Sequence, residues 1–282
     1  FLTMAGFRKP SVLPGFGLTL GFTTFFLSAL VLLPLGALVL KATALTWSEF
    51  IAILLDERAV ASYRLTFGAA FLAALVNAVF GFIVAWSLVR YDFPGRRLVV
   101  AFIDLPFALP TAVSGIALAT VFSPTGWLGQ KLALAGVQVA YTWVGVVVAL
   151  ILIGLPFVVR SVQPALQELS KDVEEAADTL GASPFYAFVR VILPAVLPAL
   201  LTGFTLAFAR GVGEYGSVIF IAGNIPMQTE ITALLIVIRL DEYDYAAAAA
   251  LGCVMLVISF LMLLAINLIQ TWGRRRQIAA KR

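Results

Sequence analysis

The sequence carries its clearest structural signal at residues 138–159, which read QVAYTWVGVVVALILIGLPFVV. These 22 residues include no charged side chain. Because an α-helix rises about 1.5 Å per residue, a stretch of this length crosses the hydrocarbon core of a membrane, which is about 30 Å thick. The pattern therefore predicts a membrane-spanning helix.

Similar apolar stretches recur along the whole chain. Hydrophobic residues make up 62% of it and charged residues 12%, whereas soluble proteins average about 45–50% and 25%. This composition excludes an ordinary water-soluble domain and predicts an all-α, polytopic membrane protein. The first stretch is longer than the roughly 7–15 apolar residues of a signal peptide, so we expect it to be retained. The six predicted spans are 16–40, 63–89, 98–122, 138–159, 195–221 and 246–270.

Lysine and arginine are unevenly distributed around these spans. Thirteen lie in the two terminal segments and the two loops on the same side, against five on the other side. The positive-inside rule then places both termini in the cytoplasm. We expect a cytoplasmic N-terminus at 1–15, a transmembrane domain at 16–270 with a large cytoplasmic loop at 160–194, and a basic cytoplasmic tail at 271–282. Because the net charge of +4 is spread over short clusters, no nucleic-acid surface is expected.

Missing residue types exclude several functions. The chain has no histidine and a single cysteine, Cys253, which rules out a His/Cys metal centre and a disulfide within the chain. We expect no metal and no cofactor. No G-x4-G-K-[ST] phosphate loop occurs, so ATP hydrolysis would have to take place on another polypeptide. An intramembrane enzyme is disfavoured because no Ser-His or paired-Asp constellation is apparent.

The loop at 160–194 contains residues that typically begin and end helices, and their positions predict two short helices. Asp172 and Glu175 have the spacing of a capping box at the start of the first. Gly181 supplies the left-handed residue that ends it. Ser183-Pro184 has the pattern of an N-cap followed by the first residue of a second helix.

The first of these helices carries a patch of small residues, Ala176 and Ala177, between carboxylates. Small side chains permit close backbone approach and charge sets orientation, so the helix is suited to docking in a groove of a soluble partner. The alternative is a helix lying on the membrane surface. An acidic run beside an anionic leaflet disfavours that alternative.

This loop resembles the EAA loop of ATP-binding-cassette importer permeases, whose pattern is E-A-A-x3-G-x9-I-x-L-P. Glu175-Ala176-Ala177, Gly181 and Leu193-Pro194 match it, and the one departure is Val191 at the Ile position. The resemblance implies that Asp172, Glu175, Ala176, Ala177 and Gly181 belong to the element that couples the permease to a cytoplasmic ATPase, with Leu193 and Pro194 leading into the fifth span.

Further segments of the chain resemble one subfamily, the sulfate/thiosulfate permeases. These segments are residues 88–96, 104–113, 141–143, 210–216 and 218–224. The resemblance implies a type I importer permease in the bacterial inner membrane, working with two ATP-binding subunits, a second permease that is a sister chain, and a periplasmic sulfate/thiosulfate-binding protein. Molybdate and tungstate permeases share parts of the pattern and remain an alternative.

Two charges lie within the fifth predicted span. Arg210 and Glu214 are four residues apart, so they share a helix face and can neutralise each other. Charges at this depth mark a transport pathway or an ion pair that fixes helix packing. A rival hypothesis, a secondary transporter, would use them with Asp104 as an ion relay; uptake that survives ATP depletion would favour it.

Glycines surround this pair. Gly211, Gly213 and Gly216 match G-x-G-x-x-G, but no βαβ unit accompanies them, so a dinucleotide site is rejected. We expect them to break the helix or form a hinge. Close packing of small residues is the alternative.

The third predicted span is also interrupted, since it contains Pro106 and Pro110. Asp104 lies near its cytoplasmic end, too shallow for direct pairing with Arg210 to be expected. Thr111 and Ser114 follow the break and could donate hydrogen bonds to an oxyanion. Alternatively, such hydroxyls bond to their own backbone.

The segment between the last two spans is predicted to be periplasmic. Its charged residues could meet a binding protein or simply be solvated; they are Glu230, Arg239, Asp241, Glu242 and Asp244. The combined hypothesis is an ATP-driven oxyanion importer that works by alternating access.

Overall fold

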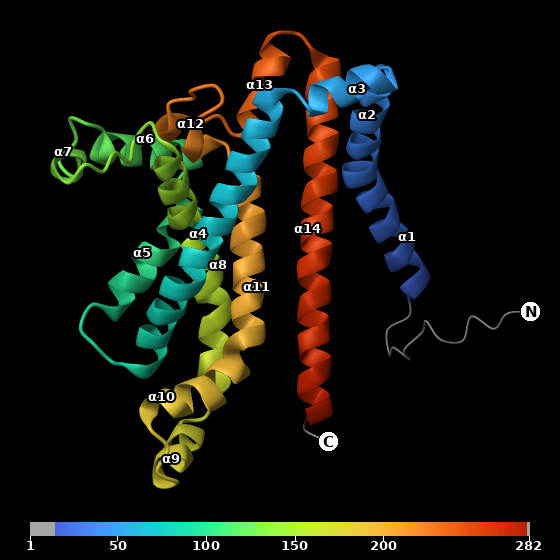
Figure 1. The fold of residues 1–282 in the computed structure, drawn as a ribbon. Coiled ribbons are helices and arrows are strands. Elements are labelled where there is room, and N and C mark those ends of the chain that lie inside the picture. Colours follow the sequence, from blue (N-terminus) through green and yellow to red (C-terminus); the bar gives the residue numbers. More distant parts are fainter. Residues whose placement is uncertain (1–14, 281–282) are drawn as a thin grey trace, which may run out of the picture.

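The computed structural model describes residues 15–280. Apart from Gly15, the predicted segment 1–15 lies outside the described residues, as do the last two residues of the predicted tail. The described chain consists of helices and connecting loops, with no strand in that range, which confirms the all-α prediction. The helices in chain order are α1 Phe16–Leu27, η1 Ser28–Leu32, α2 Leu33–Ala42, α3 Trp47–Leu54, α4 Glu57–Arg90, α5 Arg96–Ala108, α6 Thr111–Phe122, α7 Gly129–Leu134, α8 Trp143–Glu168, α9 Lys171–Thr179, α10 Pro184–Ala187, η2 Phe188–Ile192, α11 Leu193–Val212, α12 Gly216–Ala222, α13 Thr232–Asp241 and α14 Tyr245–Ala280 (Figure 1).

Five helical stretches of the described chain are long and apolar enough to cross a membrane. Four of them overlap the predicted first, second, fourth and sixth spans along most of their length, although their ends differ. The fourth span runs furthest past its prediction, because α8 continues to Glu168 and takes up the first nine residues of the predicted loop. The five stretches are Phe16–Ala42, Glu57–Arg90, Trp143–Glu168, Pro184–Val212 and Tyr245–Leu268.

The predicted third span is broken, as its prolines suggest. Helices α5 and α6 meet at an angle of 114°. The break lies at Leu109 and Pro110, because a proline disfavours helical geometry in the residue before it and has no N–H to donate. Leu109 is accordingly extended, with φ −85° and ψ 137°.

The predicted fifth span, 195–221, is wrong as a single helix. The membrane helix starts earlier, at Pro184, and ends at Val212. A short helix, α12, follows after Gly213, Glu214 and Tyr215. The break falls among the glycines, where the sequence predicted one.

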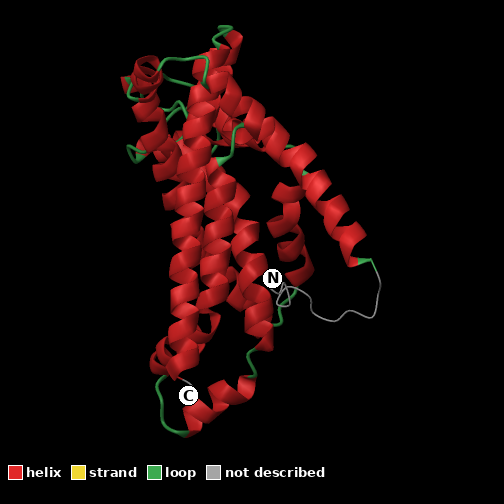
Figure 2. Cartoon of the chain, turned by 90° about the vertical axis from the view of Figure 1, so that its right-hand side faces the viewer, coloured by secondary structure: helices red, strands yellow, loops and turns green. Residues whose placement is uncertain are grey.

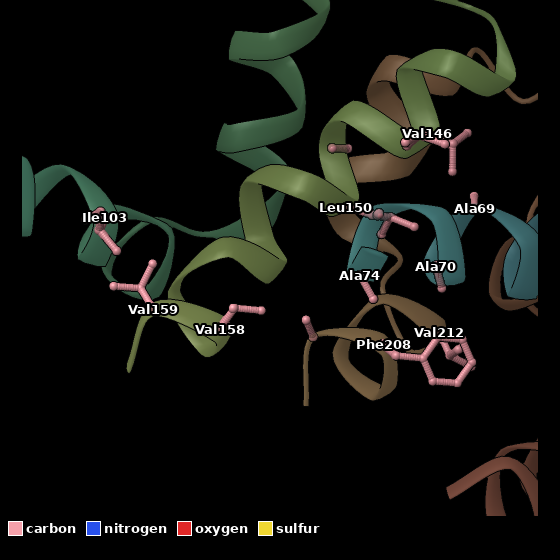
Figure 3. Close-up of a cluster of buried hydrophobic side chains, with 14 of the residues drawn as sticks. Ala69, Ala70, Ala74, Ile103, Val146, Leu150, Val158, Val159, Phe208 and Val212 are labelled. Carbon is pink, nitrogen blue, oxygen red and sulfur yellow. The ribbon is translucent and has the colours of Figure 1, made fainter. Parts of the chain in front are cut away.

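Helices α4, α8 and α11 form the core of the bundle through small residues. A Cβ at Gly203 of α11 would lie 2.8 Å from the Cα of Val158 on α8. Ala69, Ala70 and Ala74 of α4 gather with Leu150 and Phe208 in the same buried cluster (Figure 3). Small side chains let these backbones approach closely, which is a common basis of helix packing in membranes.

The first span, from α1 to α2, stands apart from this core. None of its most apolar stretch is buried within the chain. Figures 1 and 2 show it leaning away from the other long helices. Its apolar surface is therefore available to lipid or to another subunit. At one end of the bundle α9 and α10 project beyond the long helices, and we call this the α9–α10 end; α3, α7 and α13 lie at the opposite end (Figure 1).

Candidate functional site

The first candidate site is the loop at the α9–α10 end. Helix α9 begins at Lys171, and the Ser170 hydroxyl accepts a hydrogen bond of 3.2 Å from the N–H of Asp172. The predicted capping box is therefore wrong in register, because Ser170 and not Asp172 precedes the helix. Asp172 lies in the first turn, where a negative charge still favours the helix dipole.

The other predicted landmarks of the loop are present. Gly181 adopts a φ of +78°. The N–H of Ala182 donates to the carbonyl of Ala177, which ends the helix as expected. The Ser183 hydroxyl accepts from the N–H of Tyr186 and caps α10. Leu193 and Pro194 lie in the helix that runs without interruption from Pro184 to Val212, so the second predicted helix is the start of the fifth span.

The loop also exposes large apolar side chains that the sequence reasoning missed. Leu180 is 87% exposed and Phe185 is 77% exposed, and Tyr186 beside them is exposed as well. Glu175 and Ala176 are exposed on α9, and Ala177 is half-buried. Exposed apolar groups on a polar projection mark an interaction surface. Their position next to the Gly181 stop and the Ser183 cap is the signal that could have revealed them.

The second candidate site lies where α11 ends. Arg210 Nη1 and Glu214 Oε2 form an ion pair of 2.6 Å, with side chains 34% and 1% exposed. Glu214 Oε1 accepts two further hydrogen bonds from Ser217, 2.9 Å from its N–H and 3.0 Å from its hydroxyl. Ser217 was not anticipated, although its spacing three residues after Glu214 is a local signal. The buried carboxylate is thus fully partnered.

The two helix breaks meet at this point. A Cβ at Gly216, the first residue of α12, would collide with Thr111 Oγ1 at the start of α6. A Cβ at Gly115 would likewise collide with the backbone of Ser217. Figure 1 shows α6 and α12 side by side. Both interpretations of the glycines therefore hold: Gly213 follows the end of α11, and Gly216 permits close packing.

The two hydroxyls predicted as oxyanion donors lie in the first turn of α6. Ser114 is buried and Thr111 is half-buried against Gly216. Within residues 15–280 neither side chain shows a hydrogen bond to its own backbone. Both hydroxyls are therefore uncommitted in this conformation.

Asp104 pairs with Arg160 and not with Arg210. Arg160 Nε donates to Asp104 Oδ1 at 3.0 Å, and Arg160 Nη2 contacts Asp104 Oδ2. This bidentate pair ties α5 to α8, and Pro106 lies within α5. Arg160 was counted only as a loop charge, because the predicted fourth span ended one residue before it.

The charged residues between the last two predicted spans are partly structural. Glu230 is buried and accepts two hydrogen bonds of 2.7 Å from Arg58, so the expectation that it could meet a partner is wrong. Arg239 pairs with Glu242 at 3.1 Å on the surface. Asp241 is exposed and Asp244 accepts from the N–H of Ala247 at the start of α14.

One known protein family has a sequence model that matches most of this chain. The family model described as "Binding-protein-dependent transport system inner membrane component" matches residues 77–277. The chain belongs to this family. The matched region includes the α9–α10 loop, both helix breaks and the Arg210–Glu214 pair, and it excludes the first span.

Curated relatives are similar over nearly their whole length. The sulfate transport system permease protein CysT of Salmonella typhimurium is 50% identical over 265 residues, which cover 94% of this chain and 96% of the relative. The protein of the same name from Escherichia coli is 49% identical over the same shares. That of a Synechocystis strain is 49% identical over 90% of this chain and 88% of its own.

Solved structures share the fold. A chain of a bacterial ABC transporter that imports the acidic polysaccharide alginate matches with a TM-score of 0.75 and 16% identity, over 90% of this chain and 94% of its own. A chain of the inward-facing MetNI methionine ABC transporter matches with a TM-score of 0.57 and 18% identity, over 76% and 95%. This inner-membrane component therefore has the fold of an ABC importer permease.

Proposed function

We propose that this chain is the permease of an ATP-driven importer that moves sulfate, and thiosulfate with it, into the cytoplasm. The supporting observation is the identity of 49–50%, over more than nine-tenths of both chains, to relatives named as sulfate transport permeases. Molybdate and tungstate are the alternative anions. ATP is hydrolysed on separate subunits, because the chain has no phosphate loop of its own.

The α9–α10 end faces the cytoplasm in this proposal, with both termini on that side. Two ATP-binding subunits work with the permease pair, and one docks on α9. Glu175, Ala176, Ala177 and Gly181 form the docking helix, and Leu180 supplies an exposed apolar anchor beside it. Support comes from the exposure of Glu175, Ala176 and Leu180 and from the concentration of Lys and Arg on this side.

A second permease, a sister chain, completes the membrane part of the complex. The unburied surface of the first span supports this arrangement, since an obligate partner would cover it. A periplasmic sulfate/thiosulfate-binding protein delivers the anion to the opposite end. The segment around Asp241 is a surface available for it.

The anion passes the two helix breaks. Asp104, Pro106 and Pro110 belong to the α5–α6 element, and Thr111 and Ser114 begin its second half. Arg210, Gly213, Glu214 and Gly216 form the facing break. Closure of the ATP-binding subunits pushes on α9, and the long helices tilt about these breaks between inward- and outward-open states.

Uptake of radiolabelled sulfate by cells or proteoliposomes that contain the whole complex tests this function. We expect uptake that requires ATP and the binding protein and that excess thiosulfate inhibits. Uptake that survives ATP depletion but stops when the ion gradient collapses would contradict the proposal in favour of a secondary transporter. Transport of molybdate without sulfate would reassign the anion.

A further inference from the structure

The carboxylate of Glu214 is held in the manner of a bound anion. It is almost completely buried, and each oxygen faces a strong donor: Arg210 Nη1 at 2.6 Å from Oε2, and Ser217 N–H and O–H at 2.9 and 3.0 Å from Oε1. Charge-assisted hydrogen bonds of this kind are the strong ones in proteins. A carboxylate buried here without them would be very costly.

Arg210, in contrast, is open on one side. About a third of its side chain is exposed, although its partner is 1% exposed. Gly213, three residues further along the chain and just past the end of α11, is exposed and has no side chain that could cover the guanidinium. A guanidinium carries five N–H donors in a planar fork, so it can bind a second anion from the open side.

The location of the pair suits a transported anion. The pair lies at the break between α11 and α12, and α12 begins against the hydroxyl of Thr111 at the break between α5 and α6. Charges within the membrane that face an opening are usually part of a substrate path. A site for transport must also release its anion, so a group that competes with the anion for this arginine would speed its release.

From these observations we infer that Glu214 is a tethered competitor for the transported oxyanion. A tetrahedral dianion binds Arg210 from the open side, displaces the carboxylate, and is expelled when the carboxylate returns. The tether keeps the local concentration of the carboxylate high, and its charge repels the bound dianion. Arg210 therefore provides selectivity for anions, and Glu214 shortens the time for which an anion stays bound. The inference rests on the proposed function, because it takes the oxyanion as cargo.

Replacing Glu214 with glutamine isolates this role. Glu214→Gln keeps an amide oxygen that can accept from Ser217 but removes the competing charge. Binding of radiolabelled sulfate is measured at equilibrium on the purified whole complex in nanodiscs, without binding protein or nucleotide. We expect Glu214→Gln to raise the sulfate affinity at least tenfold and to slow ATP-driven uptake, because release becomes slower.

Two controls give the result its meaning. Glu230→Gln removes a carboxylate that is equally buried and equally paired to an arginine, Arg58, but lies away from the breaks; it should leave sulfate binding unchanged. The double variant Arg210→Gln/Glu214→Gln lacks the guanidinium that binds the anion, so it should lose the gain and bind sulfate no more tightly than the wild type. Ser217→Ala removes the hydroxyl that donates to the Glu214 carboxylate and leaves the charge of that carboxylate in place. It should raise the sulfate affinity severalfold, and it serves as the test if Glu214→Gln does not assemble.

The inference is overturned if neither Glu214→Gln nor Ser217→Ala binds sulfate more tightly than the wild type, or if the gain persists without Arg210. Its failure is distinguishable from failure of the proposed function, which is judged on ATP-dependent uptake by the wild-type complex. If that complex carries sulfate while the variants show no gain in binding, only the role of Glu214 is wrong.

Discussion

At the scale of single residues, the helices at the centre of the bundle pack closely because a glycine, Gly154, lies where they meet. Gly154 of α8 faces Asn77 of α4, which is fully buried, and neither amide atom of Asn77 has a hydrogen-bond partner within the described residues. A Cβ at Gly154 would collide with Asn77 Nδ2 and lie 3.3 Å from Ala207 Cβ. Three helices therefore meet at a point with no spare volume.

Gly154→Ala should destabilise the permease by about 1–3 kcal/mol, the usual effect of overpacking a core. The thermal unfolding midpoint of the purified protein in detergent measures it. Gly68→Ala is the matched control, because Gly68 lies in α4 with open space around its missing Cβ, and an alanine there should be neutral or stabilising by up to about 1 kcal/mol. Equal midpoints for both variants would contradict the packing argument.

Leu180 provides a second prediction at this scale. Leu180→Ser should weaken association with the ATP-binding subunit about tenfold, because the apolar contact made on docking is lost. Leu134→Ser is its control, since Leu134 is 90% exposed at the opposite end of the molecule and should not change association. Titration of the purified ATP-binding subunit onto permease in nanodiscs measures both. A similar loss for both leucines would remove the basis for an anchor at Leu180.

At the scale of elements, α9 is built to present a fixed shape. Its start is set by Ser170 and its end by the left-handed Gly181, and α10 continues into the fifth span through η2. In the proposed function, a force on α9 would pass through residues 180–183 into α10 and then along the continuous helix from Pro184 to Val212 towards the break at Gly213. The sequence motif and the continuity of this helix both support the proposed coupling role of the loop.

Glu175→Lys and Gly181→Asp should each abolish uptake while leaving the amount of permease in the membrane unchanged. The first reverses a charge on the docking helix, and the second places a side chain on a residue with φ +78°. Uptake and membrane content are measured in the same cells. Normal uptake by both variants at equal membrane content would rule out a coupling role for α9.

The contact between α6 and α12 gives a prediction for the paired breaks. Gly216→Ala should reduce uptake and stability, because its Cβ would meet Thr111 Oγ1 and lie 3.2 Å from Thr111 Cβ. Thr111→Ala removes the hydroxyl and should restore part of the loss, so the double variant should be more stable than the additive sum. Strict additivity of the unfolding midpoints would show that the two residues do not interact.

At the scale of the whole molecule, the proposed sidedness follows from charge alone, and it places α9 and the α13–α14 turn on opposite faces of the membrane. Cys253, the single cysteine, lies within α14, so single-cysteine variants can be built in a Cys253→Ser background. Leu180 and Tyr243 are well-exposed positions for them.

In cells without the ATP-binding subunit, Tyr243→Cys should react with a membrane-impermeant maleimide when the cells are intact. Leu180→Cys should react only after permeabilisation. The opposite order would invert the topology and with it the cytoplasmic assignment of α9. The Cys253→Ser background alone should not be labelled on either side.

The sequence was most informative where a feature depends on nearby residues. The spans follow from apolar length and the stop at Gly181 from backbone freedom. Helical spacing predicted the Arg210–Glu214 pair, which forms, but the shared helix face was wrong, because α11 ends at Val212 and Glu214 lies beyond it. It failed where the partner is distant in the chain: Asp104 pairs with a residue 56 positions away, and Arg58 with one 172 positions away. The register of α9 was missed for a local reason, since Ser170 competed with Asp172 as the cap.

Hydropathy, charge asymmetry and one loop motif were thus sufficient to establish an all-α membrane permease, because each is a short-range property of the chain in its solvent. The meeting of α6 with α12 was not accessible in this way, nor was the open face of Arg210 beside a buried Glu214. Those features depend on how separate helices pack. Gly115, Gly203 and Gly216 make the close contacts, and the sequence did not identify their partners because these lie far along the chain.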